Sequence, residues 1–216
     1  MRIPWVLLVF GCGSAPPEPT GGEDMDYAAL PFATEVVDFQ PGPGAGFGDS
    51  RLPDIVLGPP MGGGEYSGGI DVLSLGVGGE ITLSFGPREC IDGPGVDFVV
   101  FENSFRLRGT DGKIFQELAE VSVSSDGVEW STFPCEPVEM EMDEEPLGCA
   151  GWSPVLIRGL EESTPLDPSQ SGGDPFDLED LGLEAVRFVR IRDLSEEGEA
   201  PTAGFDLDAV GLVHFR

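Results

Sequence analysis

Hydrophobic positions alternate with small polar ones along several short segments of the chain, which is the pattern of half-buried β-strands. In one segment Ile81, Leu83 and Phe85 would lie on one face, and Thr82 and Ser84 on the other. Asp-Gly and Gly-Gly dipeptides between such segments are typical turn signals. The pattern predicts strands at residues 35–39, 54–57, 71–75, 80–85, 97–101, 118–124, 128–133, 154–158, 186–192 and 207–215.

One short helix is predicted at residues 174–182. Asp174 is a suitable N-cap, Pro175 suits the first helical position, and Gly182 suits the position past the end. The chain has 216 residues, of which 40% are hydrophobic, and its 32 glycines and 20 prolines fit many tight turns. The sequence therefore predicts one all-β domain, an antiparallel β-sandwich with one short helix.

The charge limits the class of partner. Lys and Arg number 11 and Asp and Glu number 40, so the formal charge is 11 − 40 = −29. Such a surface repels nucleic acid and anionic membranes. We expect no nucleic-acid partner.

The first residues are typical of an export signal. Arg2 precedes an apolar stretch at residues 3–10, and a small residue precedes Cys12. This arrangement resembles the lipobox of bacterial lipoproteins, which implies cleavage before Cys12 and a lipid on its sulfur. The alternative is a buried N-terminal strand that happens to contain a cysteine.

The resemblance also implies a division of the chain. Residues 1–11 would be the signal peptide, 12–27 a flexible tether rich in Pro, Gly and acids, and 28–216 the sandwich domain. Gly13 favours the outer membrane or cell surface as the location.

Export would place the other cysteines in an oxidising compartment, where a disulfide is expected. Cys135 and Cys149 flank a loop with six acidic residues, and closing this self-repelling loop would limit its entropy. We expect a Cys135–Cys149 disulfide, with Cys90 free and buried. A zinc site is not expected, because His214 is the one histidine and no C-x-x-C spacing occurs.

Two motifs in the second half resemble a known type of module. They are SSDGVEW at 124–130 and VRFVRI at 186–191. Together they are similar to motifs of the discoidin and coagulation-factor type C modules, which implies a galactose-binding-like jelly roll. With DFVVFEN at 97–103, PFDLEDL at 175–181 and GFDLDAVG at 204–211, the order of motifs also resembles an uncharacterised group of secreted bacterial proteins labelled "cell surface protein".

Carboxylates at strand ends suggest a metal site. Asp206 and Asp208 stand at i and i+2, so on a regular strand both side chains would leave the same face. Asp97, Glu102 and Asn103 could complete a shell of oxygens of the kind that calcium takes. The alternative is that these acids are solvated strand ends, with Glu102 and Asn103 holding a turn.

Aromatic residues in loops are candidates for stacking on a sugar. Tyr66 and Trp152 lie in Gly-rich loops and are preferred over Phe105. Trp130 begins a predicted strand and is expected in the core.

Catalysis has little support in the sequence, since no G-x-S-x-G motif occurs and a Ser-His-Asp triad would depend on His214. The first functional hypothesis is a non-catalytic surface module that binds glycan or another surface polymer. The alternative is a structural or adhesion component of the envelope without a small-molecule ligand. An acid-dependent glycoside hydrolase is the third hypothesis.

Overall fold

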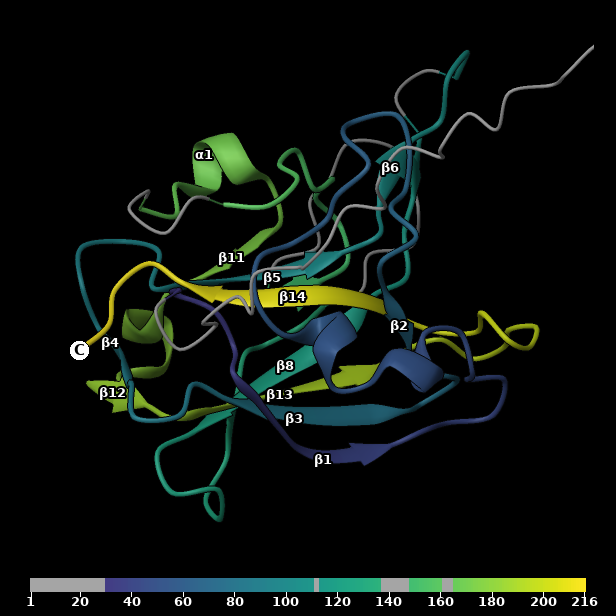
Figure 1. Cartoon of the computed structure of the whole chain (residues 1–216). Coiled ribbons are helices and arrows are strands. Elements are labelled where there is room, and N and C mark those ends of the chain that lie inside the picture. Colours follow the sequence, from purple (N-terminus) through teal and green to yellow (C-terminus); the bar gives the residue numbers. More distant parts are fainter. Residues whose placement is uncertain (1–29, 111–112, 137–147, 161–164) are drawn as a thin grey trace, which may run out of the picture.

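Two antiparallel sheets pack face to face in the computed structural model, which describes residues 30–110, 113–136, 148–160 and 165–216 (Figure 1). The larger sheet has the order β1 (Glu35–Gln40), β3 (Glu80–Ser84), β13 (Phe188–Asp193), β8 (Ala119–Ser124) and β10 (Cys149–Ala150), with β9 (Ser131–Thr132) paired to β8. The smaller sheet has the order β11 (Asp174–Phe176), β5 (Phe98–Glu102), β14 (Asp206–Leu212) and β2 (Leu73–Ser74). The predicted all-β antiparallel sandwich is confirmed.

Two short strand pairs extend from the sandwich. One joins β12 (Ala185–Val186) to β4 (Cys90–Ile91), and the other joins β6 (Phe105–Arg106) to β7 (Ile114–Phe115). The β6–β7 pair lies at the end of the molecule where β5 finishes (Figure 1).

The main core lies between the two sheets. On the larger sheet, Val189 of β13 is in register with Leu83 of β3 and Val123 of β8, and all three are buried. They face Val100 and Val210 of the smaller sheet within the same core cluster. The outer face of the larger sheet carries small polar residues at the alternating positions, as the sequence predicted.

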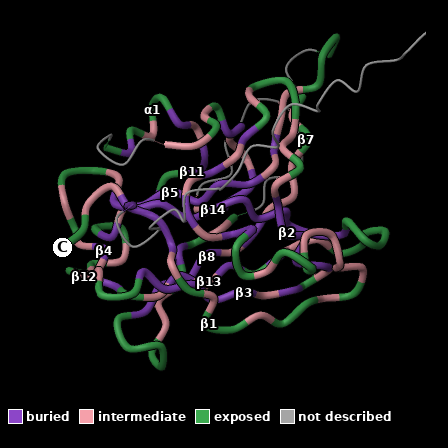
Figure 2. Tube along the Cα trace, viewed as in Figure 1, coloured by how far each residue is buried: buried purple, intermediate pink, exposed green. Residues whose placement is uncertain are grey.

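The smaller sheet is covered on its second face as well. Val99 and Phe101 of β5 pack there against Phe32, Val155 and Leu166, in a second apolar cluster. Every residue of β5 and β14 is therefore buried (Figure 2). Burial on both faces explains why neither strand shows a simple alternation in sequence.

The helix prediction at 174–182 was wrong at its start. Asp174 begins strand β11, which pairs with β5, and only a 3₁₀ turn follows, at η4 (Leu178–Leu181). The side chain of Asp177 caps this turn by accepting from the Glu179 backbone N–H, and Gly182 ends it with a φ of 64°. The one α-helix among the described residues, α1 (Pro168–Ser171), follows Asp167, which is its N-cap.

Three of the predicted strands differ in the structure. Residues 54–57 contain a 3₁₀ turn, η3 (Asp54–Val56), because Ile55 and Val56 turn inward to the core. A short apolar run in the sequence does not distinguish a strand from such a turn. A second 3₁₀ turn, η2 (Asp49–Arg51), precedes it. Within 128–133 only β9 is extended and paired, and 154–158 contributes only the isolated bridges at Val155 and Arg158.

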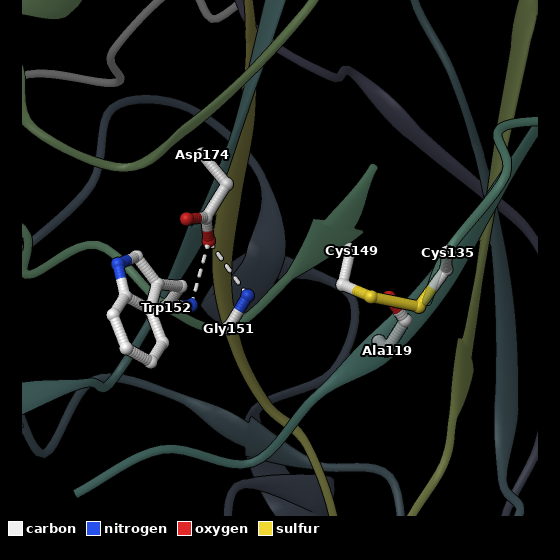
Figure 3. The surroundings of a disulfide bond; sticks show 6 residues. All are labelled: Ala119, Cys135, Cys149, Gly151, Trp152 and Asp174. Atoms are coloured by element: carbon white, nitrogen blue, oxygen red, sulfur yellow. Dashed lines mark hydrogen bonds between the residues drawn. A yellow bond between two sulfur atoms is a disulfide. The ribbon is translucent and has the colours of Figure 1, made fainter. Parts of the chain in front are cut away.

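The predicted disulfide is confirmed. Cys135 and Cys149 are joined at an S–S distance of 2.08 Å, and the bond ties the segment after β9 to β10 (Figure 3). Cys90 is a free, buried thiol, also as predicted. Cys12 and the expected signal peptide and tether lie outside the described residues.

Within the described ranges, none of the helices has the length and apolar character needed to span a bilayer.

Replacing both Cys135 and Cys149 by Ala should lower the free energy of unfolding by about 2–4 kcal/mol, because the bond restricts the unfolded chain. Urea denaturation measures the change. A reducing agent should lower the stability of the wild type to that of the variant and leave the variant unchanged; an effect of reductant on the variant would contradict this explanation.

The carboxylate of Glu89 should stabilise the folded protein at neutral pH and lose this effect in acid. The Arg187 and Arg216 side chains donate hydrogen bonds to its carboxylate and hold its pKa below 4.5. A lowered pKa stabilises the folded state above pH about 4.5, and this contribution disappears as the pH falls through the pKa of the folded protein. Glu89→Gln should therefore lower Tm at pH 7 and have less effect at pH 3, whereas the exposed Glu196→Gln should change Tm little at either pH.

Candidate functional site

The candidate site lies at one end of the sandwich, where β5 finishes at Glu102 and β14 begins at Asp206. Leu207 pairs with Glu102 across the two strands, so the two acidic residues come from adjacent strand ends. The side chain of Asp206 accepts hydrogen bonds from the Ser74 hydroxyl and, at 3.5 Å, from the Asn103 amide. Burial raises the pKa of Asp206 in spite of both bonds.

Glu102 is the most unusual residue of this end. Its side chain is fully buried, and neither carboxylate oxygen has a hydrogen-bond partner among the described residues. Its pKa is raised well above 4.5, first by burial and then by the negative charges of Asp206, Asp174 and Glu117. The backbone N–H of Asn103 opposes this rise only weakly and makes no hydrogen bond of normal geometry. A buried carboxylate in this position requires a proton or a cation.

Other unpartnered oxygens gather near Glu102. In the described residues, the buried side-chain polar atoms without a hydrogen-bond partner are all oxygens, and they belong to Glu102, Asn103, Ser104 and Gln116. Asn103 and Ser104 directly follow Glu102, and Gln116 directly follows Phe115, which pairs with Phe105. Buried polar atoms are normally satisfied, so these oxygens need donors, which either a proton on Glu102 or a cation could supply.

Glu117 adds a further carboxylate next to Gln116. Burial, together with the charges of Asp206 and Asp193, raises its pKa to about 8, although the backbone N–H of Gly204 donates to it. The charge of Asp206 thus raises the pKa values of both Glu102 and Glu117, and the charge of Glu117 adds to the rise at Glu102.

Asp174 borders this group but has its own partners. Its carboxylate accepts the backbone N–H groups of Gly151 at 2.6 Å and Trp152 at 3.2 Å (Figure 3). It also accepts the Ser153 N–H at 2.8 Å. Burial outweighs these bonds and raises its pKa to about 6. Asp174 therefore fixes the loop after β10 and contributes negative charge to the neighbouring site.

The five residues expected to bind calcium are divided among three places. Glu102, Asn103 and Asp206 come together. Asp208 accepts the Met61 backbone N–H with both oxygens, at 2.9 and 3.0 Å, and burial raises its pKa to about 7. The pairing of β14 with β5 shifts by a bulge between Leu207 and Ala209, so the regular alternation on which the sequence argument depended does not hold at Asp208.

Asp97 lies before β5, at the opposite end of that strand from Glu102, and organises the chain around it. One oxygen accepts from the Gly93 N–H and contacts His214 Nδ1, both at 2.8 Å, and the other accepts from the Leu178 N–H at 2.7 Å. Carboxylate oxygens of Asp92 and Asp177 lie within 4.8 Å of it and of each other, close enough to hold a metal ion. Because both Asp97 oxygens already have partners, we assign Asp97 a structural role.

The aromatic candidates also differ in environment. Tyr66 is 48% exposed, and the Arg108 guanidinium lies over its ring at 5.4 Å. Trp152 is half-buried beside Asp174. Trp130, expected in the core, is instead half-buried with its ring under the Arg190 guanidinium at 3.6 Å, because its side chain packs on the polar outer face of the larger sheet.

Sequence reasoning missed Ser104, Gln116 and Glu117. Their signal was a possible hairpin, since Phe105 and Phe115 flank a Gly-containing turn region. Once those two residues pair, segments 102–104 and 116–117 must lie side by side.

Comparisons with known proteins add little. No family model matches the chain, and no curated protein is similar to it in sequence. A solved structure described as "Glycoside hydrolase" is similar over 65% of this chain and 21% of its own length, with 13% sequence identity and a TM-score of 0.29. The chain thus spans about a fifth of the length of that structure.

Asp97→Asn should lower the free energy of unfolding by about 1–3 kcal/mol, because an amide group would face the N–H groups that the carboxylate accepts. Urea denaturation at pH 7 measures the loss. The exposed Asp92→Asn is the matched control and should be nearly neutral; equal losses in both variants would contradict the structural role of Asp97.

Proposed function

We propose that this protein is a non-catalytic binding module of the cell surface, stabilised by calcium and directed to glycan or another surface polymer. The observation that carries the calcium part is the group of buried oxygens without donors at Glu102, Asn103, Ser104 and Gln116. Asp206 and Glu117 are close enough for their charges to raise the pKa of Glu102, and we propose that they complete the site.

The ligand chemistry favours calcium among the common ions. The candidate ligands are carboxylate, amide and hydroxyl oxygens, with no sulfur or imidazole among them, which suits a hard cation. Calcium accepts several oxygens in irregular geometry, whereas magnesium prefers a regular octahedron and retains its waters. A divalent ion would also offset the repulsion that the charges of Asp206 and Glu117 exert on Glu102.

Burial argues against hydrolysis at these acids. A glycoside hydrolase needs two carboxyl groups that reach opposite sides of one sugar linkage. Glu102 has no exposed surface, so a polymer could not reach it. Burial is the first cause of the raised pKa values of Glu102 and Glu117, so these values do not by themselves support an acid–base pair that acts on a sugar.

Export and anchoring through Cys12 belong to the same proposal. The Cys135–Cys149 disulfide supports an oxidising compartment. A lipid on Cys12, followed by the tether 12–27, would hold the sandwich at the outer membrane or cell surface. The second candidate, an envelope component without a ligand, is favoured if no polymer binds.

The test of the calcium site is thermal unfolding of the purified protein with millimolar calcium and with excess chelator. A ligand at about 100 times its Kd adds about 2.7 kcal/mol to the free energy of unfolding. For a domain of this size we expect Tm to rise by about 5–10 °C with calcium.

The two aspartates of β14 provide matched variants. Asp206→Asn should abolish the calcium response, because it removes a carboxylate from the site. Asp208→Asn should retain the response, since its carboxylate serves Met61 and an amide oxygen can still accept that N–H. An equal response in all three proteins, or none in the wild type, would reject the site.

A further inference from the structure

The β6–β7 hairpin connects the two segments that supply the proposed calcium ligands. Asn103 and Ser104 directly precede β6, and Gln116 and Glu117 directly follow β7. One ion held by both segments would fasten the base of the hairpin. The hairpin itself projects from the sandwich (Figure 1).

Aromatic and apolar side chains are exposed on this hairpin and on the loop beside it. Phe105 and Phe115 stack with ring centroids 5.2 Å apart, and Phe115 is 42% exposed. The Arg106 N–H donates to the Glu65 carbonyl at 2.7 Å, which fixes the loop that carries Tyr66. Of the eight large hydrophobic residues exposed in the described ranges, three lie here: Tyr66, Leu107 and Phe115. A group of exposed apolar side chains differs from the single, scattered ones that are normal on a protein surface.

Positive charge is concentrated on the same hairpin. Arg106, Arg108 and Lys113 are three of the 11 cationic residues of a chain whose net charge is −29. Arg106 pairs with Glu65, and Arg108 is held over the Tyr66 ring. Repulsion from the acidic body is screened beyond about 8 Å at physiological ionic strength, so a projecting hairpin can still attract an anion.

We propose that Tyr66, Phe105, Arg108, Lys113 and Phe115, here named the hairpin surface, bind an acidic polysaccharide. Sugar rings would pack on the aromatic side chains, and carboxylate or sulfate groups would pair with Arg108 and Lys113. The proposal rests on the proposed function and names its ligand class.

The packing of the rings favours a polysaccharide over a membrane. The two phenylalanines stack on each other and Tyr66 lies under a guanidinium, so these side chains offer flat faces beside charged donors. A polymer of acidic sugars matches this combination, because each unit presents both an apolar ring face and an anionic group.

The experiment measures retention of the full-length protein on beads that carry carboxymethyl-dextran or dextran sulfate, with unmodified dextran as the neutral polymer of the same backbone. Calcium is present throughout. The wild type should bind both acidic polymers at least about tenfold more tightly than dextran, and the difference should shrink with salt.

Variants locate the binding surface. Arg108→Ala/Lys113→Ala should weaken binding to the acidic polymers about tenfold or more, and Tyr66→Ala/Phe115→Ala should weaken it as well. Arg187→Ala/Arg192→Ala is the control with the same change in charge, away from the hairpin, and should bind as the wild type does. Each variant should keep the wild-type rise in Tm with calcium, which shows that it is folded.

Each of the other outcomes would reject a specific part of the proposal. Equal binding to dextran would reject the acidic ligand and leave a glycan module. Unchanged binding in both hairpin variants would reject the hairpin surface. Retention on phosphatidylserine vesicles or single-stranded DNA in place of the polysaccharides would reject the ligand class. Failure to bind any polymer, with the calcium response intact, would reject this inference and the binding part of the proposed function but leave the calcium site.

Discussion

The smaller sheet is buried on both faces, and this burial determines where its charged side chains can lie. Apolar clusters cover β5 and β14 on either side. An acidic residue within these strands or next to them therefore loses water and needs a specific partner. The sandwich consequently places its acids at strand ends and at a bulge, where backbone N–H groups from loops can reach them.

Three of these acids are satisfied by backbone N–H groups, Asp206 is satisfied by side-chain donors, and Glu102 has neither kind of partner among the described residues. Asp97, Asp174 and Asp208 each accept backbone N–H groups that would otherwise be unpaired, and so fix loops to the sheet. Glu102 is equally buried but receives no such donor in the described residues. The contrast is informative because the same fold solves the same problem three times with hydrogen bonds. Glu102 therefore needs either a proton or the cation that we propose.

The sequence predicted the features that depend on local pattern and missed those that depend on pairing. The alternation of Val121 and Val123 with Ser122 and Ser124 identified β8, since one face meets the core and the other does not. Asp174 looked like a helix cap, but pairing with β5 made it part of a strand. The bulge at Asp208 separated two residues that an ideal strand would keep together. Composition alone could not reveal either effect, because both depend on the neighbouring strand.

The hairpin shows why a buried ion site and an exposed surface would occur together. A hairpin with two-residue strands is at best marginally stable by itself. Phe105 and Phe115 hold it in the middle, and the link to Glu65 holds one side. At its base, the negative charges of Asp206, Asp174 and Glu117 repel an ionised Glu102. A cation at the base would turn this repulsion into attraction and tie both ends of the hairpin to β14. The exposed side chains would then be held in one arrangement before a polymer arrives, which reduces the entropy lost on binding.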